Sequence, residues 1–300
     1  MTRAHSIASR RDALRALGSG LFAAVAFPAG VAVAQTADRS ARIVSLGGAV
    51  TEIAAALGAA DRVVAIDTTS THPADLLRTK PNVGYLRQLS AEGILSVRPS
   101  LVIAAEGAGP PDSLKLVREA GVVVEIVPDE PSPDGIRVKI STVARLVGRE
   151  AEGAVLARTV ADAFAALDGR RTRLGEKKRV LFVLSAQSGR MIVGGRGTSA
   201  AGMLSLAGAE NAAEAVEGFK PMSDEAVLAA QPDIVLTMQV GPGGAASAGL
   251  LDGPALSRTP AGRAGRLVAM DGSYLLGFGP RAPAAARDLM DAVYPGRPSE

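Results

Sequence analysis

The chain repeats part of its own sequence, and this repeat restricts the fold more than any other feature. Residues Ser90–Val102 align with Ser223–Val235 at a constant offset, with serine, glutamate, leucine, proline and valine in register. Each copy is typical of a serine-capped helix with an acid two residues past the cap, followed by a proline and a buried strand. Extending the register backwards pairs Arg87 with Lys220. We therefore expect two similar lobes.

Short apolar runs alternate with helical segments in both halves of the chain, and each run has the length of a strand. The runs are Ile43–Leu46, Val63–Ile66, Leu101–Ala104, Val122–Val127 and, restarting the pattern, Val180–Leu184. Alternation of this kind predicts a parallel sheet covered by helices. The predicted fold class is α/β, with two Rossmann-like lobes at residues 42–147 and 179–300.

A long helical stretch with a break near Gly148 separates the two halves. Its apolar positions fall on one face at helical spacing, namely Leu156, Val160, Ala163 and Leu167. A helix from Glu150 to Leu174 would be about 37 Å long at about 1.5 Å per residue, enough to bridge two lobes. We expect residues 148–178 to form a single linking helix. Ligand sites lie outside the carboxyl ends of parallel strands, so we expect a ligand cleft between the lobes.

Residues 1–34 have the pattern of an export signal. Ser9–Leu14 contains a twin-arginine pair, an apolar run follows, and Ala32–Ala34 is an A-x-A cleavage site. We therefore expect an exported protein that lies outside the cytoplasm; the periplasm is the location that the family resemblance described below implies. The full chain has a net charge of +3, and the leader, with four arginines and one aspartate, accounts for all of it. The mature chain gives no reason to expect nucleic-acid binding.

The scarcity of reactive side chains excludes several classes of protein. The sequence has no cysteine, which excludes thiolate metal sites and cysteine nucleophiles. It has two histidines, of which only His72 lies beyond the leader. No cluster of acids and histidines has the spacing of a metal site, and no Ser-His-Asp arrangement is possible in the second half. The sequence therefore favours a binding protein over an enzyme.

One of only three tyrosines in the chain, Tyr85, lies in a loop with Arg87 two residues further on. A phenol has a pKa near about 10 and becomes a good ligand only when a positive charge stabilises the phenolate. Ferric iron and a guanidinium would both do this. The alternative is an ordinary loop residue whose hydroxyl bonds to the backbone. The repeat favours the first reading, because it places Tyr85 and Arg87 on one wall of the cleft and Lys220 on the other.

The order of leader, lobe, spanning helix and lobe resembles the periplasmic substrate-binding proteins of bacterial ABC importers for metal-bearing ligands. The resemblance covers essentially all of the mature chain and belongs to the cobalamin and siderophore type. Within that superfamily, Gly84–Ser90 resembles the haem-binding proteins of haem importers, and Phe219–Ser223 and Asp271–Arg281 point the same way. The resemblance implies that Tyr85 is the axial ligand of ferric haem and that Arg87 is hydrogen-bonded to its oxygen.

The resemblance also implies that Glu92 and Glu225 dock onto arginines of the transmembrane permease, one from each lobe. Each glutamate stands in the first turn of its expected helix, where a negative charge is favoured, so helix capping is the alternative for either one alone. Lys220 could bind a haem propionate from the second lobe, and a solvated loop lysine is the alternative.

The second lobe contains no histidine that could supply a second iron ligand. His72 could line the cleft, although it also suits a turn. Tyr274 could approach the haem, and it could equally end a buried strand. We expect a five-coordinate haem held by Tyr85 alone.

The sequence thus predicts a non-catalytic, monomeric haem carrier that delivers to an inner-membrane ABC permease and its ATPase. A carrier for cobalamin or a ferric siderophore is the alternative within the same fold. An enzyme such as a chelatase or a haem-degrading protein, and a purely structural envelope protein, are alternatives from other classes. We expect little movement of the lobes on binding, because a continuous helix resists hinge bending.

Overall fold

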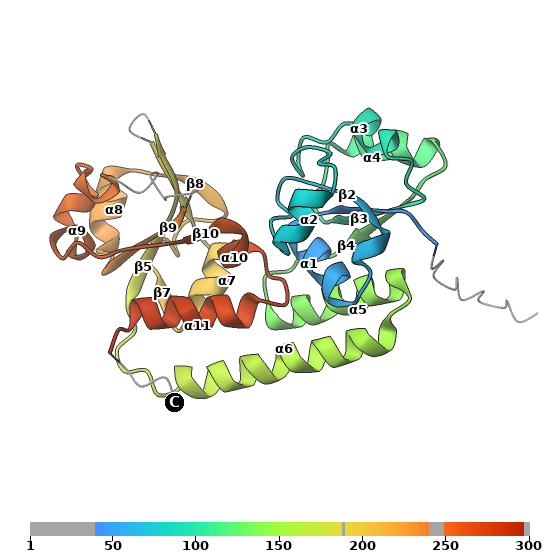
Figure 1. Cartoon of the computed structure of the whole chain (residues 1–300). Coiled ribbons are helices and arrows are strands. Elements are labelled where there is room, and N and C mark those ends of the chain that lie inside the picture. Colours follow the sequence, from blue (N-terminus) through green and yellow to red (C-terminus); the bar gives the residue numbers. More distant parts are fainter. Residues whose placement is uncertain (1–39, 188–189, 240–248, 297–300) are drawn as a thin grey trace, which may run out of the picture. The chain divides into compact units, whose positions relative to one another are not determined.

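The computed structural model describes residues 40–187, 190–239 and 249–296 of the 300-residue chain. They belong to one compact unit, Thr36–Glu300, which contains two separate β-sheets (Figure 1). The predicted signal peptide, residues 1–34, lies outside the described residues. In the described part of the chain, no helix is long and apolar enough to cross a membrane.

Sheet A has four parallel strands in the order β2-β1-β3-β4. Its strands are β1 (Ile43–Leu46), β2 (Val63–Ile66), β3 (Leu101–Ala105) and β4 (Val123–Val127). The helices between and after them are α1 (Gly48–Ala56), η1 (Ala60–Arg62), α2 (Ala74–Thr79), α3 (Ala91–Ser96), α4 (Pro111–Glu119) and α5 (Pro133–Val147). All four strands agree with the sequence prediction within one residue at either end.

Sheet B has six strands in the order β10-β9-β5-β6-β8, with β7 paired to the start of β5. Its strands are β5 (Arg179–Gln187), β6 (Arg190–Gly194), β7 (Glu210–Asn211), β8 (Phe219–Met222), β9 (Ile234–Gln239) and β10 (Leu267–Asp271). Its helices are α7 (Ser199–Leu206), α8 (Asp224–Ala230), η3 (Leu250–Asp252), η4 (Leu256–Arg258), α9 (Pro260–Arg263), α10 (Gly272–Leu276) and α11 (Ala282–Val293).

The two sheets share one topology. Taken in chain order, β5, β7, β9 and β10 of sheet B occupy the places of β1, β2, β3 and β4 in sheet A, and all their pairings are parallel. Sheet B differs by two added antiparallel strands, β6, which pairs with β5, and β8, which pairs with β6. The sequence pattern did not predict this addition, because β6 ends in glycine and β8 contains a proline, both unfavourable in strands.

The sequence repeat is confirmed as a structural repeat. Ser90 caps α3 by accepting a hydrogen bond from the Gly93 N–H at 3.3 Å, and Ser223 caps α8 through the Ala226 N–H at 3.3 Å. After each helix one non-glycine residue takes the left-handed conformation, Arg98 at φ 49° and Gln231 at φ 42°. Each turn then leads into an inner strand of its sheet, β3 or β9.

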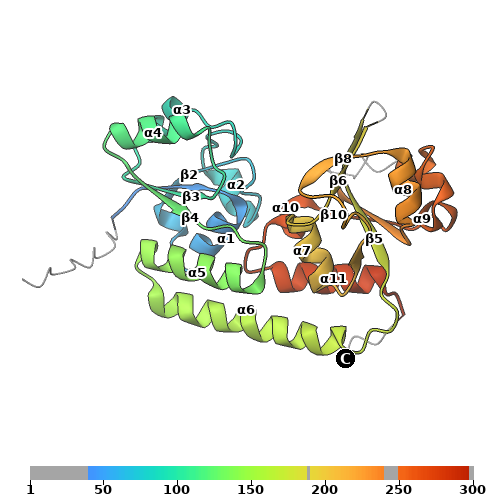
Figure 2. The same cartoon turned by 180° about the vertical axis from the view of Figure 1, so that it is seen from behind.

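The predicted linking helix is present as α6 (Glu150–Arg171), which follows α5 after a break at Gly148 with φ 64°. Helix α6 contacts both α5 and α11, and it runs alongside both in Figure 1 and, from behind, in Figure 2. Its buried face contains Phe164 in place of the expected Ala163, which is exposed. The larger side chain faces the core because its burial removes more apolar surface from water.

One hydrophobic cluster includes side chains from both sheets. It contains Ile43 of β1 and Phe182 of β5, together with apolar residues of the surrounding helices α1, α5, α6, α7 and α11. Two smaller clusters cover the other face of sheet A and the other face of sheet B. The lobe boundaries at residues 147 and 179 remain a prediction, since the two halves share one core.

Candidate functional site

Tyr85 lies in a loop at the carboxyl end of β2. The Thr68 N–H donates to the Gly84 carbonyl at 2.9 Å, and the Gly84 N–H donates to Asn82 Oδ1 at 2.8 Å. Gly84 has φ 108°, a conformation that L side chains rarely adopt, so the turn that presents Tyr85 depends on this glycine. Tyr85 therefore stands at the sheet edge where ligand sites of parallel sheets are found.

The far side of the same loop is tied to the segment after β3. The Leu89 N–H donates to the Gly109 carbonyl at 2.8 Å, and the Gly109 N–H donates to the Leu86 carbonyl at 2.9 Å. Leu89 is buried, whereas Tyr85 is 45% exposed and Arg87 is exposed. Within the described residues, no hydrogen bond or ion pair engages the Tyr85 hydroxyl or the Arg87 guanidinium. The backbone is fixed, and both side chains are free to meet a ligand.

Tyr274 has a different environment from Tyr85. It lies in α10, whose cap Asp271 accepts from the Tyr274 N–H at 2.8 Å, so the alternative that it ends a buried strand is wrong. Its hydroxyl donates to Asp288 Oδ2 at 2.9 Å, and the Arg281 guanidinium lies 5.2 Å from the ring centroid. Burial and, to a lesser extent, the Asp288 carboxylate raise the pKa of Tyr274 to about 12. This phenol is therefore a poor source of a phenolate ligand.

A small pocket lies between elements of the two halves. Its lining comes from α1, the loop after β2, α10 and the start of α11, and it includes His72 and Tyr274. His72 is exposed and directly precedes Pro73, which caps α2. The structure thus brings His72 and Tyr274 to one pocket. Neither Tyr85, Arg87 nor Lys220 belongs to this lining, so the predicted site residues do not form a single cluster.

The lining of the pocket includes an ion pair between the halves. Arg281 donates to Glu52 of α1 through its backbone N–H at 3.0 Å and through Nε at 2.8 Å. Glu52 is 8% exposed. A second link between the halves is the hydrogen bond that the fully buried Lys139 of α5 donates to the Phe278 carbonyl at 3.1 Å. Lys139 is also ion-paired with Asp129 of its own half.

Sequence reasoning gave no role to Glu52, Lys139 or Arg281. Glu52 interrupts an otherwise largely apolar helix, which is a signal that a buried partner was required. The partner, 229 residues away, cannot be identified from local spacing.

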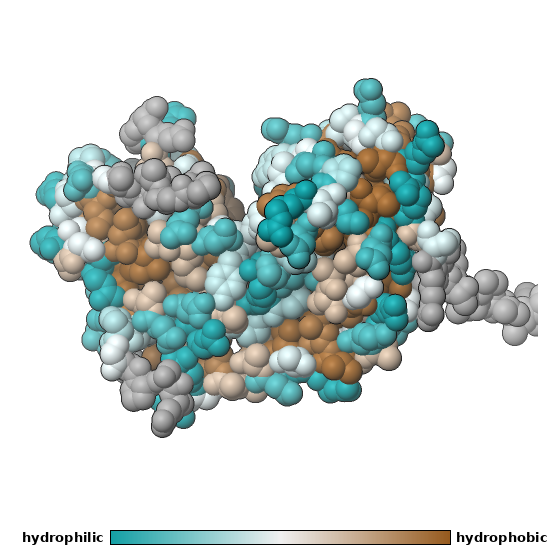
Figure 3. All heavy atoms as spheres, viewed as in Figure 1, coloured by the Kyte–Doolittle hydropathy of each residue, from teal (hydrophilic) through white to brown (hydrophobic). Residues whose placement is uncertain are grey.

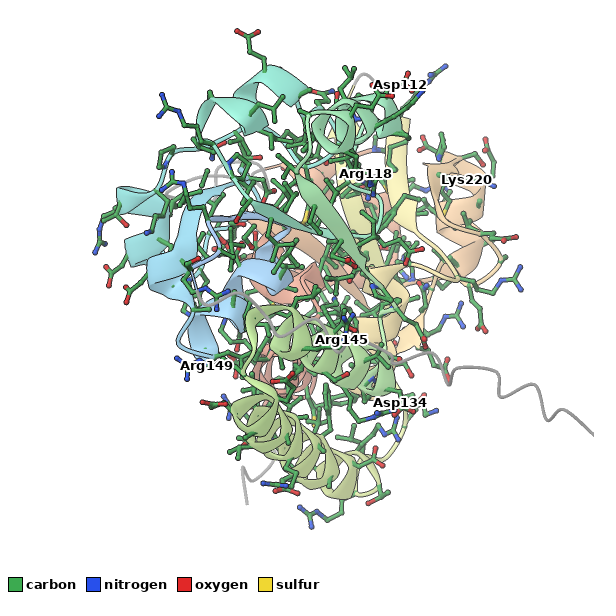
Figure 4. The ribbon with its side chains drawn as sticks, turned by 90° about the vertical axis from the view of Figure 1, so that its right-hand side faces the viewer. Asp112, Arg118, Asp134, Arg145, Arg149 and Lys220 are labelled. Atoms are coloured by element: carbon green, nitrogen blue, oxygen red, sulfur yellow. The ribbon has the colours of Figure 1, made fainter. Side chains whose placement is uncertain are left out.

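Lys220 lies on β8, the outermost strand of sheet B beside β6, and its side chain is exposed. Its cross-strand partner Val193 and its neighbour Met222 both pack in the cluster beneath α8 and α9. Because cross-strand partners share a face, Lys220 projects toward that side of the sheet. Figure 4 shows Lys220 on the sheet B half, well apart from Arg145 and Arg149 at the end of α5.

Glu92 and Glu225 occupy equivalent places in the first turns of α3 and α8, as predicted, and both are exposed. A backbone hydrogen bond and the Ser223 hydroxyl hold the pKa of Glu225 below its usual value. Each half therefore presents one exposed carboxylate at the start of its repeat-related helix. Elsewhere in the described part of the chain, no group of three or more acids or histidines could hold a metal ion.

The surface between the halves is hollowed on the face seen in Figure 3, and hydrophobic and polar side chains are mixed along it. A sequence profile of periplasmic binding proteins matches residues 43–274, more than half of the chain. The chain belongs to the periplasmic binding protein family. The predicted two-lobed α/β fold is confirmed by solved structures of this family.

Two of those structures are of haem-binding proteins. Periplasmic heme-binding protein RhuT from Roseiflexus sp. RS-1, in its apo form, is 45% identical to this periplasmic binding protein with a TM-score of 0.80, covering 85% of this chain and 98% of RhuT. Periplasmic heme-binding protein BhuT, in complex with two hemes, is 40% identical with a TM-score of 0.79, covering 84% of this chain and 97% of BhuT.

A more distant relative binds a different metal macrocycle. The vitamin B12-binding protein of Vibrio cholerae is 26% identical over 199 residues, which are 66% of this chain and 70% of that protein. The family therefore includes carriers of haem and of cobalamin, and the similarity to the haem-binding structures is the higher of the two.

Proposed function

We propose that this protein captures ferric haem in the periplasm through the phenolate of Tyr85 and delivers it to an inner-membrane ABC permease with its ATPase. The observation that carries the proposal is an exposed phenol whose hydroxyl has no hydrogen-bond partner among the described residues, on a loop held by backbone hydrogen bonds at the carboxyl edge of sheet A. The similarity to RhuT and BhuT supports haem as the ligand.

The chemistry of the two loop residues suits capture and later release. A phenolate is a hard anionic donor that favours ferric over ferrous iron. Arg87, two residues away and without a partner of its own within the described residues, can donate to the phenolate oxygen once the ligand is bound. That hydrogen bond would stabilise the deprotonated form and weaken the iron–oxygen bond, which makes release possible.

Lys220, Tyr274 and His72 have less support as haem contacts. Lys220 can reach a propionate only from the outer edge of sheet B. Tyr274 and His72 line the small pocket between the halves, where they can contact the edge of a ligand but do not supply the phenolate. The proposed haem is therefore held by Tyr85 as its one axial ligand from the protein.

Delivery would depend on Glu92 and Glu225. Two exposed carboxylates in repeat-related positions offer one negative charge on each half to basic residues of a permease. Changing both to arginine should abolish haem-stimulated ATP hydrolysis by the reconstituted importer while leaving haem binding intact. Unchanged stimulation would exclude this docking surface.

The direct test is an absorption titration with hemin of the wild type and of Tyr85→Phe. We expect the ferric-phenolate charge-transfer band to be lost, and affinity to fall at least about 100-fold, because the only anionic donor to iron is removed. Tyr274→Phe is the matched control, since that phenol already donates to Asp288. An unchanged spectrum in Tyr85→Phe would refute the proposal.

Cobalamin is the second candidate ligand, favoured by the vitamin B12-binding relative. Cyanocobalamin should raise the melting temperature if it binds, whereas the haem proposal expects no rise. A ferric siderophore is tested in the same way. We also propose a non-catalytic monomer: purified protein with hemin and a reductant should form no degradation product, and light scattering should give the mass of one chain.

A further inference from the structure

Phe219 is exposed to an unusual extent for its type. Among the described residues, the large hydrophobic side chains that are exposed include two aromatic rings, Tyr85 at 45% and Phe219 at 40%. The other phenylalanines of the described chain, Phe164, Phe182 and Phe278, are buried. Burying this flat apolar ring would stabilise the folded protein, and its exposure forgoes that free energy. The exposed ring is therefore a candidate for contact with a ligand.

The Phe219 ring is held in one orientation. It packs edge-on against the buried Phe182 ring, with 6.2 Å between the centroids and 65° between the planes. Its cross-strand neighbour is Gly194, where a Cβ atom would lie 3.2 Å from Phe219 Cε1 and 3.0 Å from Phe182 Cδ1. The glycine leaves room for both rings, so the exposed part of Phe219 is a pre-organised surface.

Phe219 lies in the segment of the sheet B half that corresponds to the Tyr85 loop of the sheet A half, one position further along the repeat register, in which Gly218 aligns with Tyr85 and Phe219 with Leu86. Tyr85 follows Gly84 at φ 108°, and Phe219 follows Gly218 at φ 73°. Each aromatic residue lies a few residues before the serine that caps the repeat-related helix, α3 or α8. The two halves thus present one exposed ring each from equivalent segments.

The alternation of β8 separates Phe219 from Lys220. Lys220 lies on the face covered by α8 and α9, whereas Phe219 packs on Phe182, which belongs to the cluster shared by both halves. Tyr274 packs against this same shared cluster. Of the two neighbours, Phe219 is therefore the one on the side of sheet B where the halves meet.

We propose that Phe219 stacks on the planar face of the ligand from the sheet B half, while Tyr85 binds its iron from the sheet A half. The inference rests on the proposed haem-binding function and adds to it a specificity for flat, apolar macrocycles. Contact between a fixed aromatic ring and a porphyrin buries apolar surface on both and requires no metal.

Binding of metal-free protoporphyrin and of hemin to the wild type, Phe219→Ala and Phe219→Leu tests the proposal. We expect Phe219→Ala to bind hemin and metal-free protoporphyrin about 3- to 10-fold more weakly than the wild type, which is the range of one aromatic contact. Phe219→Leu, which keeps an apolar contact with Phe182 but has no flat ring, should lie between Phe219→Ala and the wild type. Val155→Ala, which shortens an exposed apolar side chain on α6, should stay within about 2-fold of the wild type.

The outcomes separate this inference from the proposed function. A folded Phe219→Ala that binds the metal-free ring as the wild type does overturns the stacking role, even where Tyr85→Phe loses the hemin spectrum. If Phe219→Ala binds metal-free protoporphyrin weakly while Tyr85→Phe keeps the hemin spectrum of the wild type, stacking by Phe219 is supported and axial ligation by Tyr85 is refuted. Where Phe219→Ala fails to fold, Phe219→Leu decides in the same way. A wild type that binds neither ring overturns both proposals.

Discussion

The two halves share a topology and differ in the segment that precedes the repeated helix. In the sheet A half this segment is a loop tied to β2 and to the residues after β3, and it exposes Tyr85. In the sheet B half it is the strand β8, paired to β6, and it exposes Phe219. Equivalent segments therefore carry a potential metal ligand in one half and an apolar ring in the other, one position apart in the repeat register.

This difference shows how two halves of the same topology can make different contacts with the two sides of one ligand. The framework elements, the caps of α3 and α8 and the turns at Arg98 and Gln231, are nearly identical in the two halves. Only the loop or strand in front of them has changed its chemistry. Stability and ligand recognition are thus encoded in different parts of each repeat, and variants can address them separately.

The largest expected effect comes from removing the ion-pair partner of Lys139, the buried residue that joins the halves through its hydrogen bond to the Phe278 carbonyl. Asp129→Ala leaves a fully buried ammonium whose one remaining partner among the described residues is the Phe278 carbonyl. We expect a loss of about 2 to 4 kcal/mol in the free energy of unfolding, somewhat reduced because Asp129 itself is partly exposed. Urea denaturation of both proteins measures this difference.

Glu119→Ala is the control for Asp129→Ala. It removes an exposed ion pair with Lys115 on α4, with the charged atoms 3.8 Å apart. The expected change is below about 0.5 kcal/mol. Equal effects of the two substitutions would contradict the penalty expected for leaving the buried Lys139 ammonium without its carboxylate.

A smaller effect tests whether the repeated helices are equivalent. Ser90→Ala and Ser223→Ala each remove a cap at 3.3 Å, and we expect each to cost about 1 kcal/mol. Ser141→Ala, an exposed serine within α5, should change stability by less than about 0.5 kcal/mol. Costs that differ by more than about 1 kcal/mol between Ser90 and Ser223 would contradict the equivalence of the two helices.

The sequence predictions were correct where a feature depends on neighbouring residues and missed features that depend on residues far apart in the sequence. The helix caps and the apolar strands of the repeat were predicted correctly, because capping and strand burial depend on neighbouring residues. The strands β6, β7 and β8 were not, since they are short or contain glycine and proline. The pairing of Glu52 with Arg281 depends on the finished fold, and no local pattern encodes it.

The candidate site shows the same division. The sequence correctly placed Tyr85 in a loop before a helix, and Glu92 and Glu225 in first turns. It did not foresee that Tyr274 lies in a helix with its hydroxyl on Asp288, because Asp288 belongs to the later helix α11. Phe219 was part of a recognised motif, yet its exposure became apparent only from the packing of β8.

The smallest expected effect concerns the titration of the Tyr274 phenol. The pKa of Tyr274 is raised to about 12, above the usual value near about 10, so the folded state favours the protonated phenol. Its contribution to stability is present below pH about 10 and is lost as the pH rises toward about 12. An ultraviolet titration of phenolate should show a late step that disappears in Tyr274→Phe. Identical curves for both proteins would contradict the raised pKa.

The hydrophobic cluster that contains both Ile43 and Phe182 has a consequence for how this protein melts. Two halves with separate interiors would unfold independently and give two calorimetric peaks. Here heat should produce a single cooperative transition, because α6 and α11 cannot leave one half without exposing the other. For the same reason neither half, expressed alone, would keep its fold, and a ligand touching only one of them would still protect the entire chain from proteases.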